Sequence, residues 1–192
     1  GVTPLPPLWA LAFHQSRWGY RGDSDLFELA EKFEACRFPA DGLWLDIDYM
    51  DGYRVFTFDS EHLPRPSETT AALGSRGFRV VPILDPGVKK EKGYGVYESG
   101  KEADVFCRTG AGTEFVGEVW PGPTVFPDFS LPEARSWWAD HARTFFEAGF
   151  SGAWLDMNDP STGSVDPTDM RFGRGRHDHQ AFRNQYALLM AK

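Results

Sequence analysis

Short apolar runs alternate with segments of helical periodicity along the whole chain. The apolar runs occupy residues 8–13, 42–47, 79–84 and 152–155, and each is predicted to be a buried strand. Pro82 lies inside the third run, where a central strand tolerates proline poorly. Strands that alternate with helices pair in parallel through right-handed crossovers, so the pattern predicts an α/β fold. The βα units fit either a small doubly wound sheet or half of a barrel, and periodicity alone does not choose between them.

The segments between the apolar runs carry the start and stop signals of helices. Helices are predicted from about Asp25 to before Pro39, from Ser67 to about Gly74, from Ser130 to Gly149, and from about His179 to Ala191. Three signals agree at the start of the third: Ser130 is a good N-cap, Pro132 falls in the first turn, and Glu133 comes three residues after the cap. These signals fix where the helices lie but do not decide how the strands are arranged.

Length and loop composition bound the domain organisation. The chain has 192 residues, which suits one domain but falls short of the roughly 250 residues of a complete (β/α)8 barrel. The interval from Val88 to Phe129 is rich in glycine and proline, and loops of that length are usually functional or contain structure of their own. We therefore expect a single domain over residues 1–192, built from about four βα units with a long insertion near 88–129.

Composition and charge exclude several classes of function. The net charge of −8 and the pI of about 5.1 argue against a nucleic-acid partner, because binding phosphates needs clustered Lys and Arg. No stretch approaches 18 consecutive apolar residues, so we expect no membrane partner. Cys36 and Cys107 are far apart and have no metal-ligand neighbours. A reduced, cytoplasmic setting is the simpler interpretation, although two cysteines leave a disulfide open.

Acidic residues follow three of the predicted strands. They are Asp46 and Asp48, Asp85, and Asp156 with Asp159. The carboxyl ends of parallel strands meet at one edge of a sheet, so we expect these acids to converge. Asp85, which precedes Pro86, fits a loop-capping carboxylate equally well. Asp46 and Asp156 each come two residues after a tryptophan, which favours a sugar site, a metal site or both, since sugars stack on aromatic faces beside carboxylates.

Other kinds of site have weak or no support in the sequence. The His177-Asp178-His179 cluster is the only candidate for metal ligation, and we interpret it as a surface cluster rather than a ligand set. No glycine-rich phosphate loop follows a strand, and no Gly-x-Ser-x-Gly elbow occurs. We therefore predict neither a metal nor a cofactor, and serine hydrolases and P-loop enzymes do not fit.

Several longer motifs occur in a specific order along nearly the whole chain. They are Phe13-His14-Gln15-Ser16-Arg17-Trp18-Gly19-Tyr20, Asp46-Ile47-Asp48-Tyr49-Met50-Asp51, Leu84-Asp85-Pro86-Gly87-Val88, Val119-Trp120-Pro121-Gly122, Phe126-Pro127-Asp128-Phe129 and Trp154-Leu155-Asp156-Met157-Asn158. With these motifs the chain resembles glycoside hydrolase family 31, the α-glucosidase family. The Asp-Ile-Asp-Tyr-Met block is more similar to the α-glucosidase members than to the α-xylosidase members.

The resemblance implies a fold, a reaction and a set of site residues. The fold would be a (β/α)8 TIM barrel, of which this chain forms half, and the reaction would be retaining hydrolysis of terminal α-linked glucose. Asp156 would be the nucleophile of the covalent glycosyl-enzyme intermediate, and Asp46 would bind sugar hydroxyls in the −1 subsite. The residues implied to line that pocket are Trp18, Ile47, Val88, Trp120, Trp154 and Met157. Such a transition state needs a carboxylate beside the anomeric carbon and apolar walls around it.

Two departures from the family pattern shape the functional hypotheses. Asp159 stands where the family usually has glutamate after the asparagine. The family's acid/base carboxylate belongs to the later half of the barrel, and retaining hydrolysis needs two carboxyls about 5–5.5 Å apart. We therefore expect the chain alone to be inactive, and a carbohydrate-binding or inactive half-barrel is the alternative to an α-glucosidase. A metal-dependent enzyme of another barrel family is a more distant alternative.

The expected partner is an α-glucoside or oligosaccharide substrate. A half-barrel exposes two strand edges and an apolar interior, which promotes association. We therefore expect either that two copies pair as a homo-oligomer that closes the barrel, or that the chain is part of a longer protein.

Overall fold

The computed structural model describes residues 4–192, which divide into two compact units. The first unit comprises the residues up to Asp51 together with Phe58–Ile83 and Phe146–Trp154. The second unit comprises Gly52–Thr57, Leu84–Phe145 and Leu155–Lys192. The chain twice passes from the first unit to the second near the C-terminal end of a strand.

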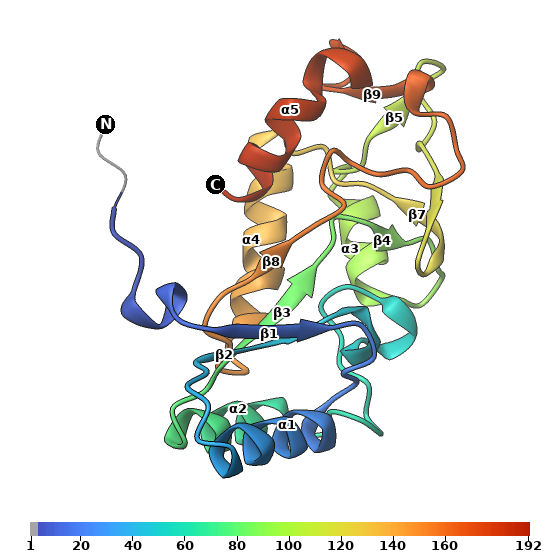
Figure 1. The fold of residues 1–192 in the computed structure, drawn as a ribbon. Helices are drawn as coiled ribbons and strands as arrows, with labels where there is room; N and C mark the ends of the chain where they lie inside the picture. The colour runs from blue at the N-terminus through green and yellow to red at the C-terminus, as the bar shows by residue number, and fades with distance from the viewer. Residues whose placement is uncertain (1–3) are drawn as a thin grey trace. The chain divides into compact units, whose positions relative to one another are not determined.

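A four-stranded sheet is the framework of the first unit (Figure 1). Its strands are β1 (His14–Arg17), β2 (Gly42–Leu45), β3 (Arg79–Leu84) and β8 (Trp154–Leu155), in the order β1-β2-β3-β8. β1, β2 and β3 pair in parallel, with Gly42 opposite both His14 and Arg79. The strand order follows the chain order, without the reversal that marks a doubly wound sheet. The predicted parallel βα units of half a (β/α)8 barrel are confirmed.

Two helices, α1 (Asp23–Ala35) and α2 (Pro66–Ser75), lie side by side along the same side of these strands (Figure 1). Both were predicted, and α1 begins slightly before the predicted start. The reason is that Asp25 lies within the first turn, where its carboxylate accepts the N–H of Arg21 (2.8 Å). The apolar side of α1 faces inward, and Leu26 on that side is completely buried.

The prediction of a buried strand over residues 8–13 is wrong. Leu8–Leu11 form a 3₁₀ helix, and β1 begins only at His14. Leu8 is 86% exposed, so this run is not part of the core. A short apolar run has no periodicity that separates a strand from a helical turn. Here the turn is held locally, because the His14 ring bonds the carbonyl oxygen of Trp9 (2.8 Å) and stacks on its indole.

The other predicted strands are confirmed with small changes at their ends. β3 has the predicted bounds and includes Pro82, which lies opposite Leu45 of β2. β8 is shorter than predicted, because pairing is confined to Trp154 and Leu155. The core of the first unit is formed by buried side chains from its strands and helices, among them Leu26, Leu43, Leu45, Leu73 and Val81.

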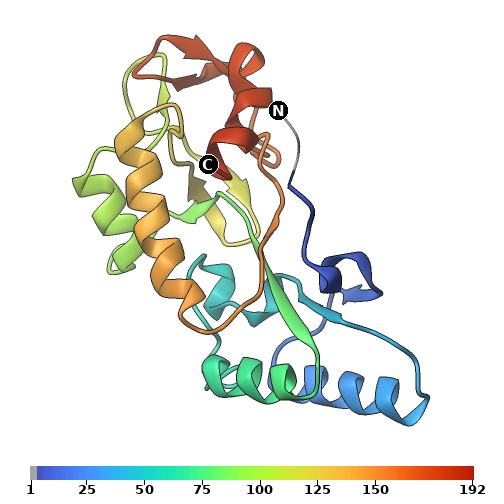
Figure 2. The same cartoon turned by 90° about the vertical axis from the view of Figure 1, so that its left-hand side faces the viewer.

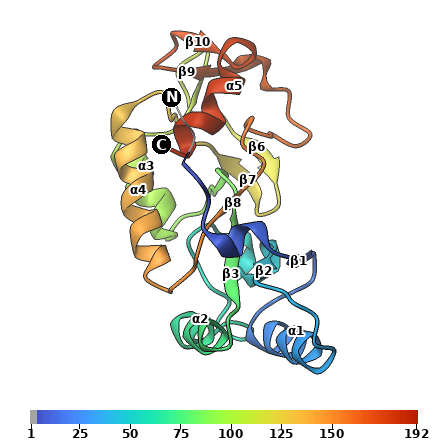
Figure 3. The same cartoon turned by 60° about the vertical axis from the view of Figure 1, so that its left-hand side comes forward.

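The second unit contains two three-stranded sheets. One has the order β4-β7-β6, with strands Val88–Lys89, Gly122–Val125 and Gly117–Val119. The other has the order β10-β9-β5, with strands His177–Asp178, Met170–Phe172 and Arg108–Thr109. Helix α5 (His179–Met190), whose position was predicted, lies beside β9 and β10 (Figure 3). The interval 88–129 contains β4 to β7.

Two further helices of the second unit, α3 (Gly95–Glu102) and α4 (Pro132–Phe146), lie side by side (Figure 2). Ser99 joins them, because its Oγ accepts the indole N–H of Trp137 (3.0 Å) and lies 3.2 Å from Nε2 of His141. Burial lowers the pKa of His141, since the charged ring would lose hydration there. The contact between the two helices therefore favours a neutral histidine.

Thr70 in α2 gives a test of how the first unit is held together. Its hydroxyl donates to the buried carbonyl of Ala148 (2.5 Å). Replacing Thr70 by valine keeps the side-chain shape but removes the donor, so the free energy of unfolding should fall by about 1–3 kcal/mol. Thr69→Val is the matched control, because the Thr69 hydroxyl makes only a local bond, to the carbonyl of Arg65 at the N-cap of the same helix (3.1 Å). Urea unfolding measures the free energy of unfolding of both variants. Equal losses of stability in the two would contradict the greater role of Thr70.

Candidate active site

Asp46 is the first residue after β2 in the first unit. Its Oδ1 accepts the backbone N–H of Ile47 (2.7 Å), so the carboxylate caps the short 3₁₀ helix η2 (Ile47–Tyr49). The hydroxyl of Tyr49 donates to the carbonyl of Ile83 (2.8 Å) near the end of β3. The backbone at the end of β2 is therefore fixed from both sides. A carboxylate has about four lone-pair directions, so the cap bond uses only part of its capacity to accept hydroxyl protons.

Two tryptophans of the predicted pocket also lie in the first unit. Trp18 follows β1 and is 70% exposed. Trp154 belongs to β8, and its ring centroid lies 5.9 Å from that of Trp44. The Trp44 indole donates to Nδ1 of His14 (3.0 Å), which orients the ring that Trp154 contacts. Trp18 thus faces solvent, whereas Trp154 is held by ring contacts.

Asp156 directly follows β8 and is exposed, at the start of a segment of the second unit. The next residue, Met157, has a backbone φ of +54°, in the left-handed region that side chains other than glycine rarely adopt. Its carbonyl accepts the N–H of Ser161 (2.8 Å), which closes the turn after Asp156. Backbone strain of this kind costs about 1–3 kcal/mol and concentrates at functional sites. The turn after Asp156 therefore holds Met157 in a strained conformation.

Val88 and Trp120 both belong to the β4-β7-β6 sheet of the second unit. Val88 lies opposite Val125 and is completely buried. Trp120 lies at the turn between β6 and β7 and is 52% exposed. Two residues of the predicted pocket are thus carried by one sheet, one within it and one at its edge.

The segment that follows Asp156 is attached to the same sheet. The N–H of Glu118 in β6 donates to the carbonyl of Thr162 (3.1 Å), and Glu118 forms an isolated parallel bridge with Gly163. The strand that carries Trp120 and the segment that begins at Asp156 are therefore joined by backbone contacts within the second unit.

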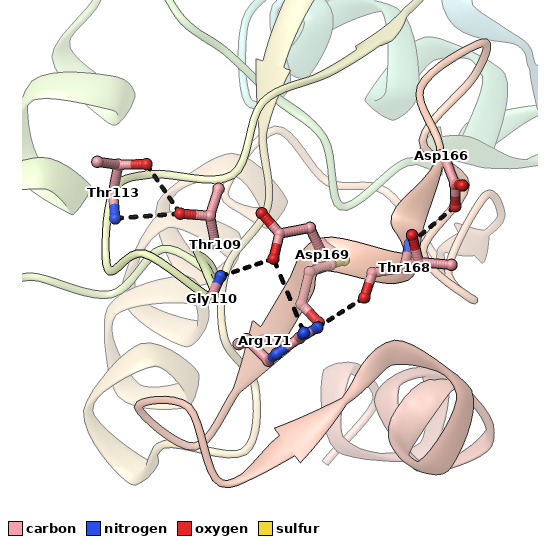
Figure 4. A network of polar contacts seen from close by, with 8 residues as sticks. Thr109, Gly110, Thr113, Asp166, Thr168, Asp169 and Arg171 are labelled. Carbon is pink, nitrogen blue, oxygen red and sulfur yellow. Dashed lines mark hydrogen bonds and ion pairs between the residues drawn. The ribbon is translucent and has the colours of Figure 1, made fainter.

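A polar network holds the later part of this segment (Figure 4). Asp169 accepts the N–H of Gly110 (2.9 Å), and its carboxylate lies 3.7 Å from the Arg171 guanidinium. Arg171 donates to the carbonyl of Thr168 (2.7 Å), and Asp166 accepts the N–H of Thr168 (2.9 Å). These bonds join the turn after β5 to the residues that lead into β9.

The predicted site residues fall into two groups. Trp18, Asp46, Ile47 and Trp154 belong to the first unit, and Val88, Trp120, Asp156 and Met157 belong to the second. Their roles in catalysis and substrate binding stay predictions. Sequence reasoning missed the contact between Glu118 and Gly163, because a glycine in a polar loop is an ordinary turn residue. Only the positive φ of Gly163, which the structure reveals, marks it as special.

The His177-Asp178-His179 cluster has structural contacts. Asp178 caps α5 by accepting the N–H of Ala181 (2.8 Å), and the ring of His177 stacks on that of Phe182. Among residues 4–192, no three His, Cys, Asp or Glu side chains lie close enough together to hold a metal ion. No helix within the described part of the chain has both the length and the apolar character to cross a membrane.

Comparison with known proteins decides the family. The family model for the TIM-barrel domain of glycosyl hydrolases family 31 matches residues 3–192. The chain belongs to this family. The resemblance predicted from the ordered motifs is confirmed, as is the assignment to the glycosidases among the hydrolases.

The relatives that match this chain cover nearly all of it. α-Glucosidase 2 of Bacillus thermoamyloliquefaciens is 41% identical over 197 residues, which cover 100% of this chain and 25% of that protein. A solved family 31 α-glucosidase from Bacteroides thetaiotaomicron has a TM-score of 0.84 and 40% identity, covering 100% of this chain and 31% of its own. The glucosidase II α subunit has a TM-score of 0.87 and 31% identity, covering 94% of this chain and 20% of its own. The chain therefore spans between a fifth and a third of these relatives.

Asp128 is a buried acid in one of the motifs that carry the resemblance to family 31. It accepts the hydroxyl of Ser130 (2.5 Å) and the N–H of Gly173 (2.7 Å), and it is only 2% exposed. Burial raises the pKa of Asp128 above the ordinary carboxyl value of 3.8, and these hydrogen bonds oppose the rise. Asp128 thus ties the start of α4 to the turn between β9 and β10 at the cost of burying a charge.

The raised pKa of Asp128 predicts a dependence of stability on pH. A raised folded-state pKa contributes stability below the unfolded value, and the contribution is lost as pH rises through the folded-state pKa. Asp128→Asn carries no charge, so its melting temperature relative to the native protein should rise as pH increases from 3.8 towards neutrality. Thermal unfolding across this range measures the difference, with the exposed cap Asp166→Asn as control. A difference that is constant with pH would contradict the prediction.

Proposed function

We propose that this protein is a retaining α-glucosidase that hydrolyses terminal α-linked glucose through a covalent intermediate on Asp156. The observation that carries the proposal is the position of Asp156 directly after β8 in a TIM-barrel domain of family 31. In barrels of parallel strands, residues at the C-terminal strand ends perform the chemistry. The likeness to proteins named α-glucosidase supports the choice of reaction.

The proposed chemistry assigns a role to each of the predicted site residues. The Asp156 carboxylate attacks the anomeric carbon as the bond to the leaving group breaks, and a general acid protonates the departing oxygen. Water then releases glucose from the ester, and the same acid, now a base, takes the proton of that water. Asp46 binds sugar hydroxyls. The proposed walls of the −1 subsite are Trp18, Ile47, Val88, Trp120, Trp154 and Met157.

A second carboxyl is required by this mechanism. Retaining hydrolysis uses two carboxyl groups about 5–5.5 Å apart, and only Asp156 has been assigned. We propose that the general acid lies outside these 192 residues, in further strands of a longer polypeptide or in a second copy that closes the barrel. This chain aligns with only a fifth to a third of the length of its relatives, which supports the proposal that the general acid lies outside it. On this proposal the 192 residues alone do not turn over substrate.

The substrate class and the cellular setting are further parts of the proposal. The substrate is an α-glucoside or an α-linked oligosaccharide. A cytoplasmic location is supported by Cys36 and Cys107, which form no disulfide. Burial raises the pKa of the Cys107 thiol, which keeps it protonated and unreactive.

The role of Asp156 is tested by removing its charge. Asp156→Asn in the full-length protein should lower the rate of hydrolysis of an aryl α-glucoside by on the order of 10⁴-fold or more, because the amide is a poor nucleophile. The glycosyl-enzyme should also disappear from quenched reactions. Initial rates and mass spectrometry of the quenched protein measure the two effects.

Asp166→Asn is the matched control for Asp156→Asn. It makes the same change of charge in the same segment, and asparagine still caps the N–H of Thr168. This variant should hydrolyse the glucoside as the native protein does. Full activity of Asp156→Asn would contradict the assignment of the nucleophile. A native protein that binds the glucoside without turnover would instead favour a carbohydrate-binding role.

The role of Asp46 is tested by a pair of substitutions. Asp46→Ala removes both the cap on Ile47 and the acceptor for sugar hydroxyls, so KM should rise by the equivalent of about 1–3 kcal/mol. Asp46→Asn keeps a capping oxygen but loses the charged acceptor. Steady-state kinetics of both variants separate the two roles. A KM in Asp46→Asn equal to that of the native protein would show that only the cap matters.

A further inference from the structure

The hairpin formed by β6 and β7 carries Trp120 at its turn. Glu118 lies two residues before Trp120, so the backbone of Glu118 sets where the turn begins. On the other side of β6 is the segment that begins at Asp156, and the contact is made by the backbone at Thr162 and Gly163. The hairpin that carries Trp120, a proposed sugar-binding residue, thus contacts the segment that begins at Asp156, the proposed nucleophile.

Only glycine fits at position 163. Its φ is +68°, and a Cβ there would overlap the carbonyl oxygen of Glu118 far inside van der Waals contact. That oxygen belongs to the backbone and has no rotamer by which to move aside. A side chain at position 163 would therefore have to push β6 away from the segment.

Thr162 fixes the backbone that presents Gly163. Its side chain is buried, and its hydroxyl donates to the carbonyl of Val165 (2.6 Å). Its own carbonyl accepts the N–H of Glu118 (3.1 Å). The turn closed by Ser161 and Met157 (2.8 Å) continues the connection back to the residue after Asp156. A short series of backbone bonds therefore links Asp156 to the hairpin of Trp120.

We propose that Gly163 is a positioning residue that seats the Trp120 hairpin against the nucleophile segment and thereby sets the affinity for the sugar. The proposal rests on the proposed function, because it gives Trp120 and Asp156 their roles in that site. Gly163 has no side chain and acts only through Trp120. Its contribution is that, without a Cβ, it lets the backbone of Glu118 in β6 come close.

The first test compares two glycine substitutions in the full-length protein. Gly163→Ala should lower kcat/KM for an aryl α-glucoside by about tenfold or more, mostly through a higher KM. Gly175→Ala is the matched control, because Gly175 also has a positive φ (+93°) but has open space where a Cβ would lie. It should change kcat/KM by less than about twofold. Equal effects of the two substitutions would overturn the proposal.

A double-mutant cycle shows whether Gly163 acts through Trp120. In a Trp120→Ala background, Gly163→Ala should change kcat/KM by less than about twofold, because the ring that it positions is absent. A merely structural role would give the same loss in both backgrounds and would overturn the proposal. If Gly163→Ala does not fold, Thr162→Val replaces it in the cycle, and Thr162→Ser, which keeps the hydroxyl, should restore native kinetics.

Binding measurements separate this inference from the proposed function. The Kd of the glucoside for Asp156→Asn is measured with and without Gly163→Ala, so that no turnover is needed. Weaker binding in the double variant supports the role of Gly163 in positioning, and unchanged binding overturns it. Failure of the nucleophile assignment would appear separately, as hydrolysis that survives Asp156→Asn.

Discussion

Parallel pairing of β1, β2 and β3 in a common register is the constraint on which the rest of the structure depends. Each strand needs a crossover before the next can pair beside it, which places α1 and α2 on the same side. At Gly42 the strands approach so closely that a Cβ would lie 2.7 Å from the His14 ring. β2 and all of β3 except Arg79 are apolar, and acidic residues follow directly after β2 and β8. β2 thus delivers Asp46 and β8 delivers Asp156.

The second unit uses a different means of fixing its segments. Its strands contain only two to four residues, and individual hydrogen bonds from backbone N–H groups tie the segments between them. The N–H of Glu118 bonds Thr162, and the N–H of Gly110 bonds Asp169 (Figure 4). Each of these bonds fixes the path of the backbone where it is made, and so fixes where the neighbouring side chains start. The place of Trp120 therefore depends on residues that have no chemistry of their own.

Sequence patterns predicted the elements whose signals are local. Helices α4 and α5 were located because they are long enough for apolar spacing to repeat and because local signals mark their starts: Pro132 and Glu133 in the first turn of α4, and the cap Asp178 before α5. The predicted N-cap Ser130 is wrong, because α4 begins at Pro132 and the Ser130 hydroxyl donates to Asp128. The run at 8–13 was misjudged because a short apolar run fits a strand and a helical turn equally well. The ordered motifs supplied the candidate site residues, yet nothing local in them indicates that Glu118 meets Gly163. Contacts between residues that are distant in the chain produce no periodic pattern in the sequence, so they could not be predicted from it.

The strain in the segment after Asp156 is consistent with a role in catalysis. Met157 has a φ of +54°, which residues other than glycine rarely adopt, whereas the φ of +68° at Gly163 is one that glycine adopts freely. A carboxylate that attacks an anomeric carbon must be oriented before the substrate binds, because order created in advance is not lost on the way to the transition state. Short backbone bonds supply that order at little cost in side-chain entropy. A turn closed by its own backbone bond, as between Ser161 and Met157, is therefore a better support for a nucleophile than a mobile loop.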